Sequence, residues 1–183
     1  MSKPRLKEHY LGIVVKALME VFNYKNVHEV PAIEKIIINT AFKSTDDKNH
    51  INEVFEQVKL ISGQHPVFTK AKKSISNFKL RAGMPIGVKV TLRGNRMYEF
   101  LDRLVNIAMP NIRDFRGIVR VRMDGKGNWT LGIVDSSIFP ESTRDSSKGS
   151  LGMDITFVTS AKTDKEGKEL LEKMGFPFIK RNK

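Results

Sequence analysis

The stretch IGVKVTLR, residues 86–93, alternates apolar and polar side chains from end to end. Successive side chains of an extended strand point to opposite faces, so the apolar members share one face: Ile86, Val88, Val90 and Leu92. The other face receives Gly87, Lys89, Thr91 and Arg93. A strand of this pattern packs one face on helices and leaves the other in solvent, which is typical of an antiparallel sheet. The segment MDITFVT, residues 153–159, alternates in the same way.

The rest of the chain supplies further strands and four amphipathic helices. β-Branched and aromatic residues predict strands at 33–39, 66–70, 74–80, 118–123 and 128–133, with a hairpin turn at 124–127. Apolar residues at helical spacing predict helices that contain 11–22, 51–58, 97–108 and 170–174. Asn95 is the expected cap of the third helix, and Thr163 with Glu166 forms a capping box before the fourth.

This order of elements predicts the fold class. Adjacent strands joined by short loops favour a mainly antiparallel sheet. We therefore expect one α+β domain over residues 1–183, built of two layers. Helices pack on one face of the sheet, and the opposite face is basic and polar.

Positive charge is concentrated around the quoted stretch. The chain has a formal net charge of +12, and no Asp or Glu occurs between Glu56 and Glu99. Nine cations lie in this acid-free segment: Lys59, Lys70, Lys72, Lys73, Lys79, Arg81, Lys89, Arg93 and Arg96. Such an excess indicates an anionic partner, either a nucleic acid or an anionic membrane surface. A wet sheet face needs only polar side chains, but a face selected for solubility alone normally mixes both signs of charge.

The segment 70–82 combines cations with hydroxyl and amide groups and a single aromatic residue, Phe78. We expect a basic hairpin at the sheet edge, followed by a turn at Gly83-Met84-Pro85. Its side chains suit phosphate and ribose contacts. Phe78 has two interpretations: it stacks on a base, or, with Ile75, it anchors the hairpin in the core. We favour the core position.

The sequence contains no pattern typical of catalysis or metal binding. It has no cysteine, its histidines are scattered, and the phosphate-loop, dinucleotide and nucleophile-elbow patterns are absent. We expect no enzyme activity, no cofactor or metal, and no small-molecule substrate. No apolar run approaches the roughly 20 residues that span a bilayer, and no apolar leader opens the chain, so we expect no membrane partner and a cytoplasmic location.

Several segments, in order along nearly the whole chain, resemble the bacterial family of ribosomal large-subunit protein number five, which binds 5S ribosomal RNA. The longest is ISGQHPVFTKAKKSISNFKLRAGMPIGVKVTLRG, residues 61–94. The others are KIIIN (35–39), RMYEFLDRLVNIAMPNIRDFRG (96–117), GNWTLGI (127–133), IFPE (138–141), GMDITFVTSAKTDKE (152–166) and LLEKMGFPF (170–178). The long block is specific to the family.

The resemblance implies an α+β fold whose sheet and loops dock on 5S RNA in the large subunit. The family pattern assigns RNA contacts to Asn39, Gln64, Thr69, Thr91, Arg93 and Asp154. We add the neighbouring polar positions Lys70, Lys89 and Thr156. From the residues alone, Asp154 has two roles: to hold a neighbouring Arg, or to accept a hydrogen bond from a ribose hydroxyl or base amine.

The resemblance also implies contacts inside the assembled ribosome. The basic hairpin would approach the elbow of the transfer RNA in the peptidyl site, through Lys72, Lys73, Ser74, Ile75, Ser76, Asn77, Phe78, Lys79 and Arg81. A bridge to a protein of the small-subunit head is expected at Arg113, Asp114 and Arg116. The remaining expected partners are neighbouring large-subunit RNA and proteins.

Two other classes of function compete with an RNA-binding ribosomal protein. A DNA-binding protein would use the same charge without RNA selectivity, but no helix-turn-helix pattern occurs and the basic residues lie on strands. An RNA-processing enzyme needs a carboxylate cluster or a general base, and Asp154 is the only acid expected on the basic face. We rank both below the first.

Overall fold

Strand β3 (Pro85–Leu92) has the alternation that its sequence predicts. Val88, Val90 and Leu92 are buried, Lys89 is exposed and Thr91 is half-buried. The molecule is represented by a computed structural model, which describes residues 3–43, 47–113, 115–118, 123–142 and 151–179. The predicted strand at 118–123 lies mostly outside these residues.

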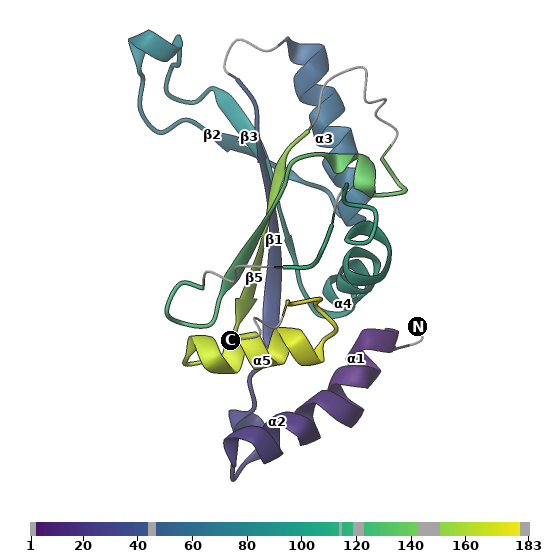
Figure 1. The fold of residues 1–183 in the computed structure, drawn as a ribbon. Helices are drawn as coiled ribbons and strands as arrows, with labels where there is room; N and C mark the ends of the chain where they lie inside the picture. The colour runs from purple at the N-terminus through teal and green to yellow at the C-terminus, as the bar shows by residue number, and fades with distance from the viewer. Residues whose placement is uncertain (1–2, 44–46, 114, 119–122, 143–150, 180–183) are drawn as a thin grey trace. The chain divides into compact units, whose positions relative to one another are not determined.

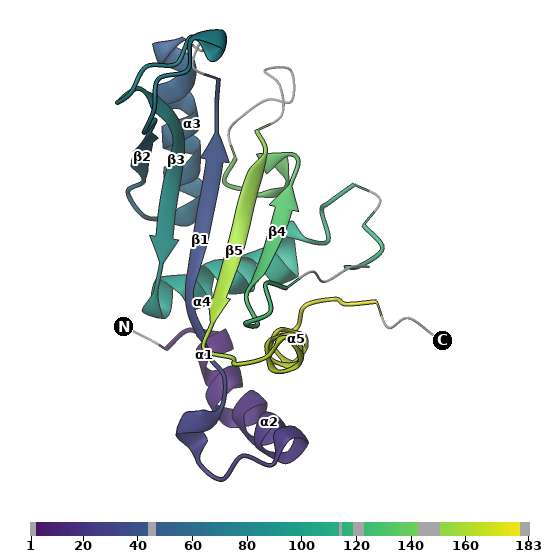
Figure 2. The same ribbon diagram turned by 90° about the vertical axis from the view of Figure 1, so that its left-hand side faces the viewer.

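The sheet has five strands in the order β2-β3-β1-β5-β4. The strands other than β3 are β1 (Ile33–Ala41), β2 (Val67–Lys70), β4 (Trp129–Ile133) and β5 (Met153–Thr159). Neighbouring strands run antiparallel, as the arrows of β3, β1, β5 and β4 in Figure 2 show, and helices pack against the sheet. The predicted α+β class is therefore confirmed.

The helices are α1 (Arg5–His9), α2 (Val15–Phe22), α3 (Lys48–Ser62), α4 (Gly94–Arg103) and α5 (Asp164–Lys173). Two π-helical turns, η1 (Tyr10–Val14) and η4 (Leu104–Ala108), continue α1 and α4. Short 3₁₀ turns occur at η2 (Val27–Glu29), η3 (Ser76–Phe78) and η5 (Ser136–Ile138). The predicted capping box of α5 is present, since the Thr163 side chain accepts from the Glu166 amide and the Glu166 carboxylate accepts from the Thr163 amide.

The chain forms two compact units. One comprises Ile37–Leu92 and Leu131–Ile155, and the other comprises Met1–Ile36, Arg93–Thr130 and Thr156–Lys183. In the first unit, α3 lies along one face of β2 and β3 (Figure 1). In the second, an aromatic cluster forms the core: Trp129 stacks on Phe157 at 5.4 Å between ring centroids, and Phe176 meets both rings edge-on.

The N-terminal helical segment differs from its predicted apolar stripe. The stripe predicts a buried Leu11, but this residue is 55% exposed, whereas Leu6, Val14 and Leu18 are buried. The π-helical turn η1 explains the error, because an i→i+5 turn adds a residue and shifts the later positions around the helix axis. Asn95 is also not a cap: α4 begins at Gly94, and the Asn95 side chain accepts a hydrogen bond from Lys7.

The segment 74–80 is not a strand. Ile75 and Leu80 form one isolated antiparallel bridge, and the residues between them make the 3₁₀ turn η3. Lys79 adopts φ +50°, the left-handed region, which interrupts an extended chain. Apart from this one bridge, none of the described strands pairs with the segment, so its strand propensity is not realised.

Candidate nucleic-acid interface

Helix α3 covers one face of β2 and β3. The Phe55 ring stacks on Phe68 of β2 at 4.7 Å between centroids, and Val54 and Val58 are fully buried. Phe68 pairs with Val88, whose side chain points to the same inner face. The side chains that alternate with these therefore point away from α3.

The opposite surface of this unit is polar and partly exposed. Val67 pairs with Lys89, and Thr69 pairs with Gly87, so these four residues share the outer face of β2 and β3. We define the open face as this outer surface and its continuation on β1 and β5. Its members are Asn39, Val67, Thr69, Gly87, Lys89, Thr91 and Asp154.

At Gly87, residues of β1 and β2 lie close to the backbone of β3. A Cβ atom at this position would lie 2.6 Å from the Thr40 carbonyl oxygen and 2.9 Å from the Thr69 hydroxyl. The alternation predicts Gly87 on the wet face, but the residue is buried because these two neighbours close over it. At Gly87 the open face therefore consists of backbone atoms, and polar side chains lie on either side of it.

Gln64 is held beside Thr91. Helix α3 ends at Ser62, followed by Gly63 with φ +65°, and the Ser62 hydroxyl accepts from the Gln64 amide. The Gln64 side-chain Nε2 donates to the Thr91 carbonyl oxygen at 3.1 Å. This hydrogen bond joins two predicted site residues, Gln64 and Thr91, and holds Gln64 at the edge of the open face.

Asn39 and Asp154 extend the open face onto β1 and β5. Asn39 is half-buried between the buried Ile38 and Thr40, and the Thr40 hydroxyl donates to the Gly152 carbonyl at 2.6 Å. Asp154 is exposed, and its neighbours on the strand, Met153 and Ile155, are buried. The alternation predicted for this segment is confirmed.

Arg93 and Thr156 belong to the other compact unit. Arg93 follows β3 directly, is exposed and precedes the first turn of α4. The Thr156 hydroxyl lies 2.9 Å from the hydroxyl of Thr130, a residue that sequence reasoning missed. Its signal was present, because Thr130 follows the buried Trp129 and must point to the opposite face of β4.

The segment 71–84 forms a basic loop that projects past the ends of β2 and β3 (Figure 1). Its base is closed by hydrogen bonds from the Ala71 amide to the Met84 carbonyl and from the Gly83 amide to the Ala71 carbonyl, both 2.9 Å. The Ala82 amide donates to the Ser74 hydroxyl at 2.9 Å. The predicted turn at 83–85 begins earlier: the Met84 amide donates to the Arg81 carbonyl at 3.2 Å, Gly83 adopts φ +88°, and Pro85 already belongs to β3.

The predicted core position of Phe78 is wrong. Phe78 is 69% exposed and Ile75 is 44% exposed. Among the described residues the loop extends beyond β2 and β3 (Figure 1), and its nearest sheet residues, Ala41 and Ile86, leave both side chains largely exposed. The side chains of Lys72, Lys73, Ser74, Ser76, Asn77, Lys79 and Arg81 are exposed as well.

The residues expected at the subunit bridge are only partly described. Arg113 and Arg116 are exposed, and Asp114 lies outside the described residues. Lys70 is exposed at the end of β2, where the pairing with β3 shifts register.

Neither a metal site nor a membrane helix is found in the part of the chain that the structure describes. No group of three or more His, Cys, Asp or Glu lies close enough to hold an ion there. Among the same residues, no helix is long and apolar enough to cross a membrane.

Comparisons with known proteins match both halves of the chain. Residues 26–81 match the family described as ribosomal protein L5, and residues 85–178 match the model of the C-terminal part of that ribosomal family. Three similar proteins, each named large ribosomal subunit protein uL5, come from Alkaliphilus oremlandii, Desulforamulus reducens and Brevibacillus brevis. The first is 54% identical and the other two are 53% identical, each over 177 residues. These alignments cover 96% of this chain and 98–99% of each relative.

Proposed function

Because the chain belongs to the ribosomal protein L5 family, whose members are structural constituents of the large ribosomal subunit, we propose that its open face and Arg93, which follows β3, bind 5S ribosomal RNA. Membership of the family means that the chain associates with ribosomal RNA and proteins and is not an enzyme. The choice of 5S RNA as the direct partner is the proposal.

The observation that carries this proposal is a polar, acid-poor strand face next to a concentration of cations. Lys89 and Thr91 project from β3, with Thr69 on the neighbouring strand. No carboxylate occurs between Glu56 and Glu99 along the chain. Lys and Arg would neutralise phosphates, and threonine hydroxyls with the Asn39 and Gln64 amides would contact ribose and bases.

Asp154 fits this role better than that of a catalytic base. It lies on the open face, where a carboxylate accepts hydrogen bonds from a ribose hydroxyl or a base amine. A single carboxylate would leave a metal ion without the further ligands that a two-metal nuclease needs, and no such cluster occurs among the described residues.

The basic loop serves a second contact in this proposal. The loop extends beyond the ends of β2 and β3 (Figure 1), and its cations and hydroxyl groups are exposed, which supports a contact separate from the open face. We assign to it the elbow of the peptidyl-site transfer RNA. Arg113, Asp114 and Arg116 are proposed to contact a protein of the small-subunit head.

The test is competitive binding of the full chain to 5S RNA, to another structured RNA of similar length and to duplex DNA, titrated with salt. We expect the 5S complex to survive salt concentrations that dissociate the other two. Equal affinities with equal salt slopes would reduce the surface to a non-specific electrostatic patch.

Two variants separate the surfaces. Arg93→Ala removes a charged hydrogen-bond donor and is expected to weaken 5S binding by about 1–3 kcal/mol. Lys72→Ala with Lys73→Ala removes two charges from the basic loop and is expected to weaken 5S binding less. Equal losses would place the loop in the 5S interface.

A further inference from the structure

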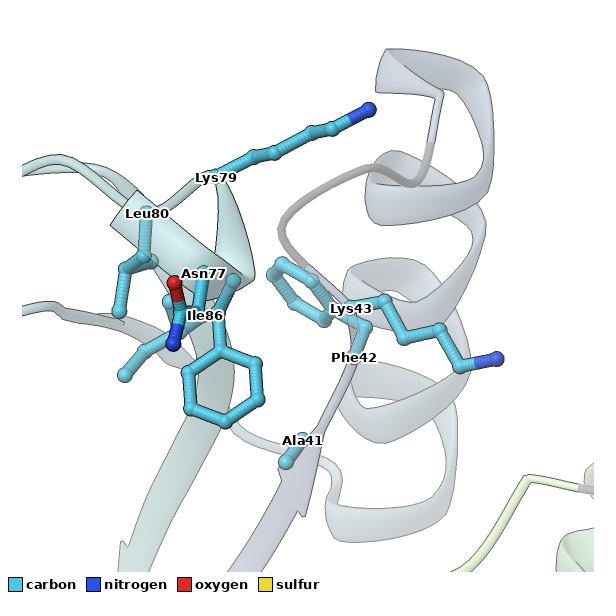
Figure 3. A pocket seen from close by; sticks show the side chains of 8 residues that line it. Ala41, Phe42, Lys43, Asn77, Lys79, Leu80 and Ile86 are labelled. Atoms are coloured by element: carbon cyan, nitrogen blue, oxygen red, sulfur yellow. The ribbon is translucent and has the colours of Figure 1, made fainter. Parts of the chain in front are cut away.

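A pocket of about 620 Å³ lies between the end of β1 and the basic loop. Ala41, Phe42 and Lys43 line one side, Asn77–Leu80 line the other, and Ile86 of β3 completes it. Figure 3 shows the two sets of side chains facing each other, with the side chains of Lys43 and Lys79 extending away from the pocket on the side of α3. Its volume is within the roughly 300–1,000 Å³ of small-molecule sites.

The lining combines apolar and aromatic side chains with few polar groups. Phe42 and Phe78 provide two aromatic rings, and Leu80 and Ile86 provide aliphatic contact. Asn77 carries an amide, which both donates and accepts hydrogen bonds. Aromatic rings with an amide suit a flat heteroaromatic ligand whose faces are apolar and whose edges are polar.

A second hollow adjoins the pocket on the other side of Lys79 and Leu80. Its volume is about 400 Å³, and it is lined by Ser74, Ser76, Lys79, Leu80 and Arg81. Hydroxyl groups and cations of this kind bind phosphate oxygens and ribose. The two hollows share Lys79 and Leu80, so an apolar site and an anion-binding site lie next to each other.

Lys79 is positioned by an unusual backbone conformation. Its φ of +50° lies in the left-handed region, which non-glycine residues seldom adopt outside Asn and Asp. This conformation closes the turn after η3 and places Lys79 in the walls of both hollows. A cationic residue therefore contributes to the walls of both hollows.

We propose that this pocket receives an unstacked nucleobase of a structured RNA, with the phosphate or ribose of the same nucleotide chain in the adjoining hollow. The proposal rests on the RNA-binding function proposed above and adds a defined subsite to the basic loop. Phe42 and Phe78 contact the base, Asn77 contacts its edge, and Lys79 neutralises a flanking phosphate.

The charge of the surroundings favours RNA over the apolar side chain of a protein partner. The loop residues from 72 to 81 include Lys72, Lys73, Lys79 and Arg81, and this segment contains no Asp or Glu. A purely apolar anchor gains nothing from this ring of cations, whereas each RNA phosphate releases counterions when it meets one.

The test uses Phe78→Trp as a fluorescent reporter in the full chain. The native Trp129 is buried, so it contributes a constant background. The control is Val134→Trp, because Val134 is 82% exposed and lies outside the pocket. Each variant is titrated at low salt with a transfer RNA transcript, which has unpaired bases in its loops, and with a fully paired RNA duplex of equal length.

We expect the transfer RNA to quench the Phe78→Trp variant and the duplex to leave it unchanged at equal bound fraction, measured by anisotropy of labelled RNA. The control is expected to respond to neither. A separate variant without the tryptophan reporter, Phe78→Leu, keeps an apolar side chain but removes the ring. It should weaken transfer RNA binding about 10-fold without changing how the affinity depends on salt concentration. Lys79→Asn keeps a residue that tolerates the left-handed region, and it should lower the slope of log affinity against log salt concentration by about 0.7–0.9.

Other outcomes overturn the proposal. Equal quenching by transfer RNA and duplex would mean that no base enters the pocket. An unchanged affinity in Phe78→Leu would leave the pocket to another occupant, such as an apolar side chain of a protein. If the wild-type chain binds 5S RNA but not transfer RNA, the pocket and the transfer RNA contact proposed for the basic loop both fail, while the 5S site stands. If it binds neither RNA, the proposed function fails as a whole. Unfolding midpoints verify that each variant is folded.

Discussion

Gly87 is the position at which the open face tolerates the least change, and Gly87→Ala tests this directly. The added methyl group would lie 2.6 Å from the Thr40 carbonyl oxygen and 2.9 Å from the Thr69 hydroxyl oxygen. Both distances are below the 3.0 Å that real Cβ atoms keep from other heavy atoms. The Thr69 side chain can rotate, but the Thr40 carbonyl belongs to the backbone of β1, so β1 and β3 must separate locally.

The expected cost follows from two opposing terms. Forcing a methyl group into a packed site costs about 1–3 kcal/mol. Replacing glycine by alanine also removes conformational freedom from the unfolded chain, which stabilises by about 0.4–1 kcal/mol where the backbone conformation permits alanine. We expect a net loss of about 1–2 kcal/mol in the free energy of unfolding, which corresponds to a Tm lower by roughly 2–8 °C.

Gly132→Ala is the matched control. Gly132 lies on β4, where an added Cβ would meet only the Asp154 carboxylate, at an ordinary contact distance of 3.6 Å. The control should be neutral or slightly stabilising, up to about 1 kcal/mol. Urea titration followed by circular dichroism measures both variants. If Gly87→Ala is as stable as Gly132→Ala, the close approach of β1 to β3 at Gly87 is wrong.

Three further predictions concern the second compact unit. Thr163→Ala removes the capping box of α5 and should cost about 1 kcal/mol in urea titrations, whereas a loss below about 0.3 kcal/mol would show that the box contributes little. Gly167→Ala should destabilise by at least about 2 kcal/mol, because its Cβ would lie 2.5 Å from the Gly127 carbonyl oxygen and 2.7 Å from the Gly127 Cα; a Tm equal to that of the parent would refute that approach. Burial and the nearby Tyr98 raise the pKa of Tyr10 to about 12, so this phenol ionises in the unfolded chain before it ionises in the folded chain. The free energy of unfolding should therefore fall as the pH rises from about 10 to 12. This loss should be smaller in Tyr10→Phe, and an identical loss in both proteins would refute the assignment to Tyr10.

The strand pattern was the reliable part of the sequence because a single rule governs it. In residues 86–93 the alternation predicts that all apolar side chains point to one face of the strand, and Val88, Val90 and Leu92 are buried in the structure. The same rule placed Asp154 and Thr156 on the outer face of β5. The alternation wrongly predicted an exposed Gly87, because its burial depends on Thr40 and Thr69, which approach it from other strands.

The predictions for residues 74–80 and for Leu11 were wrong because their structure depends on features outside the local sequence pattern. Residues 74–80 have strand-like composition, but strand formation needs a neighbour, and the loop extends beyond the strands on which it is built. Leu11 has helical spacing relative to Val14, Val15 and Leu18, but the π-helical turn η1 changes the phase of the stripe. Neither feature has a signal within a short sequence window.

The exposed position of Phe78 changes how the basic loop is understood. An aromatic side chain that is 69% exposed gives up the stabilisation of burial, which is about 1.5–3 kcal/mol for a fully buried residue of this size. Charge alone does not explain this loss, because the cations of the loop would bind phosphate equally well around a polar side chain. The pocket that Phe78 forms with Phe42 accounts for the ring, since stacking on a base recovers about 1–3 kcal/mol only when RNA is bound. On this argument Phe78→Leu leaves the stability of the free protein nearly unchanged and weakens only the RNA complex, whereas a ring that served the fold would show the reverse.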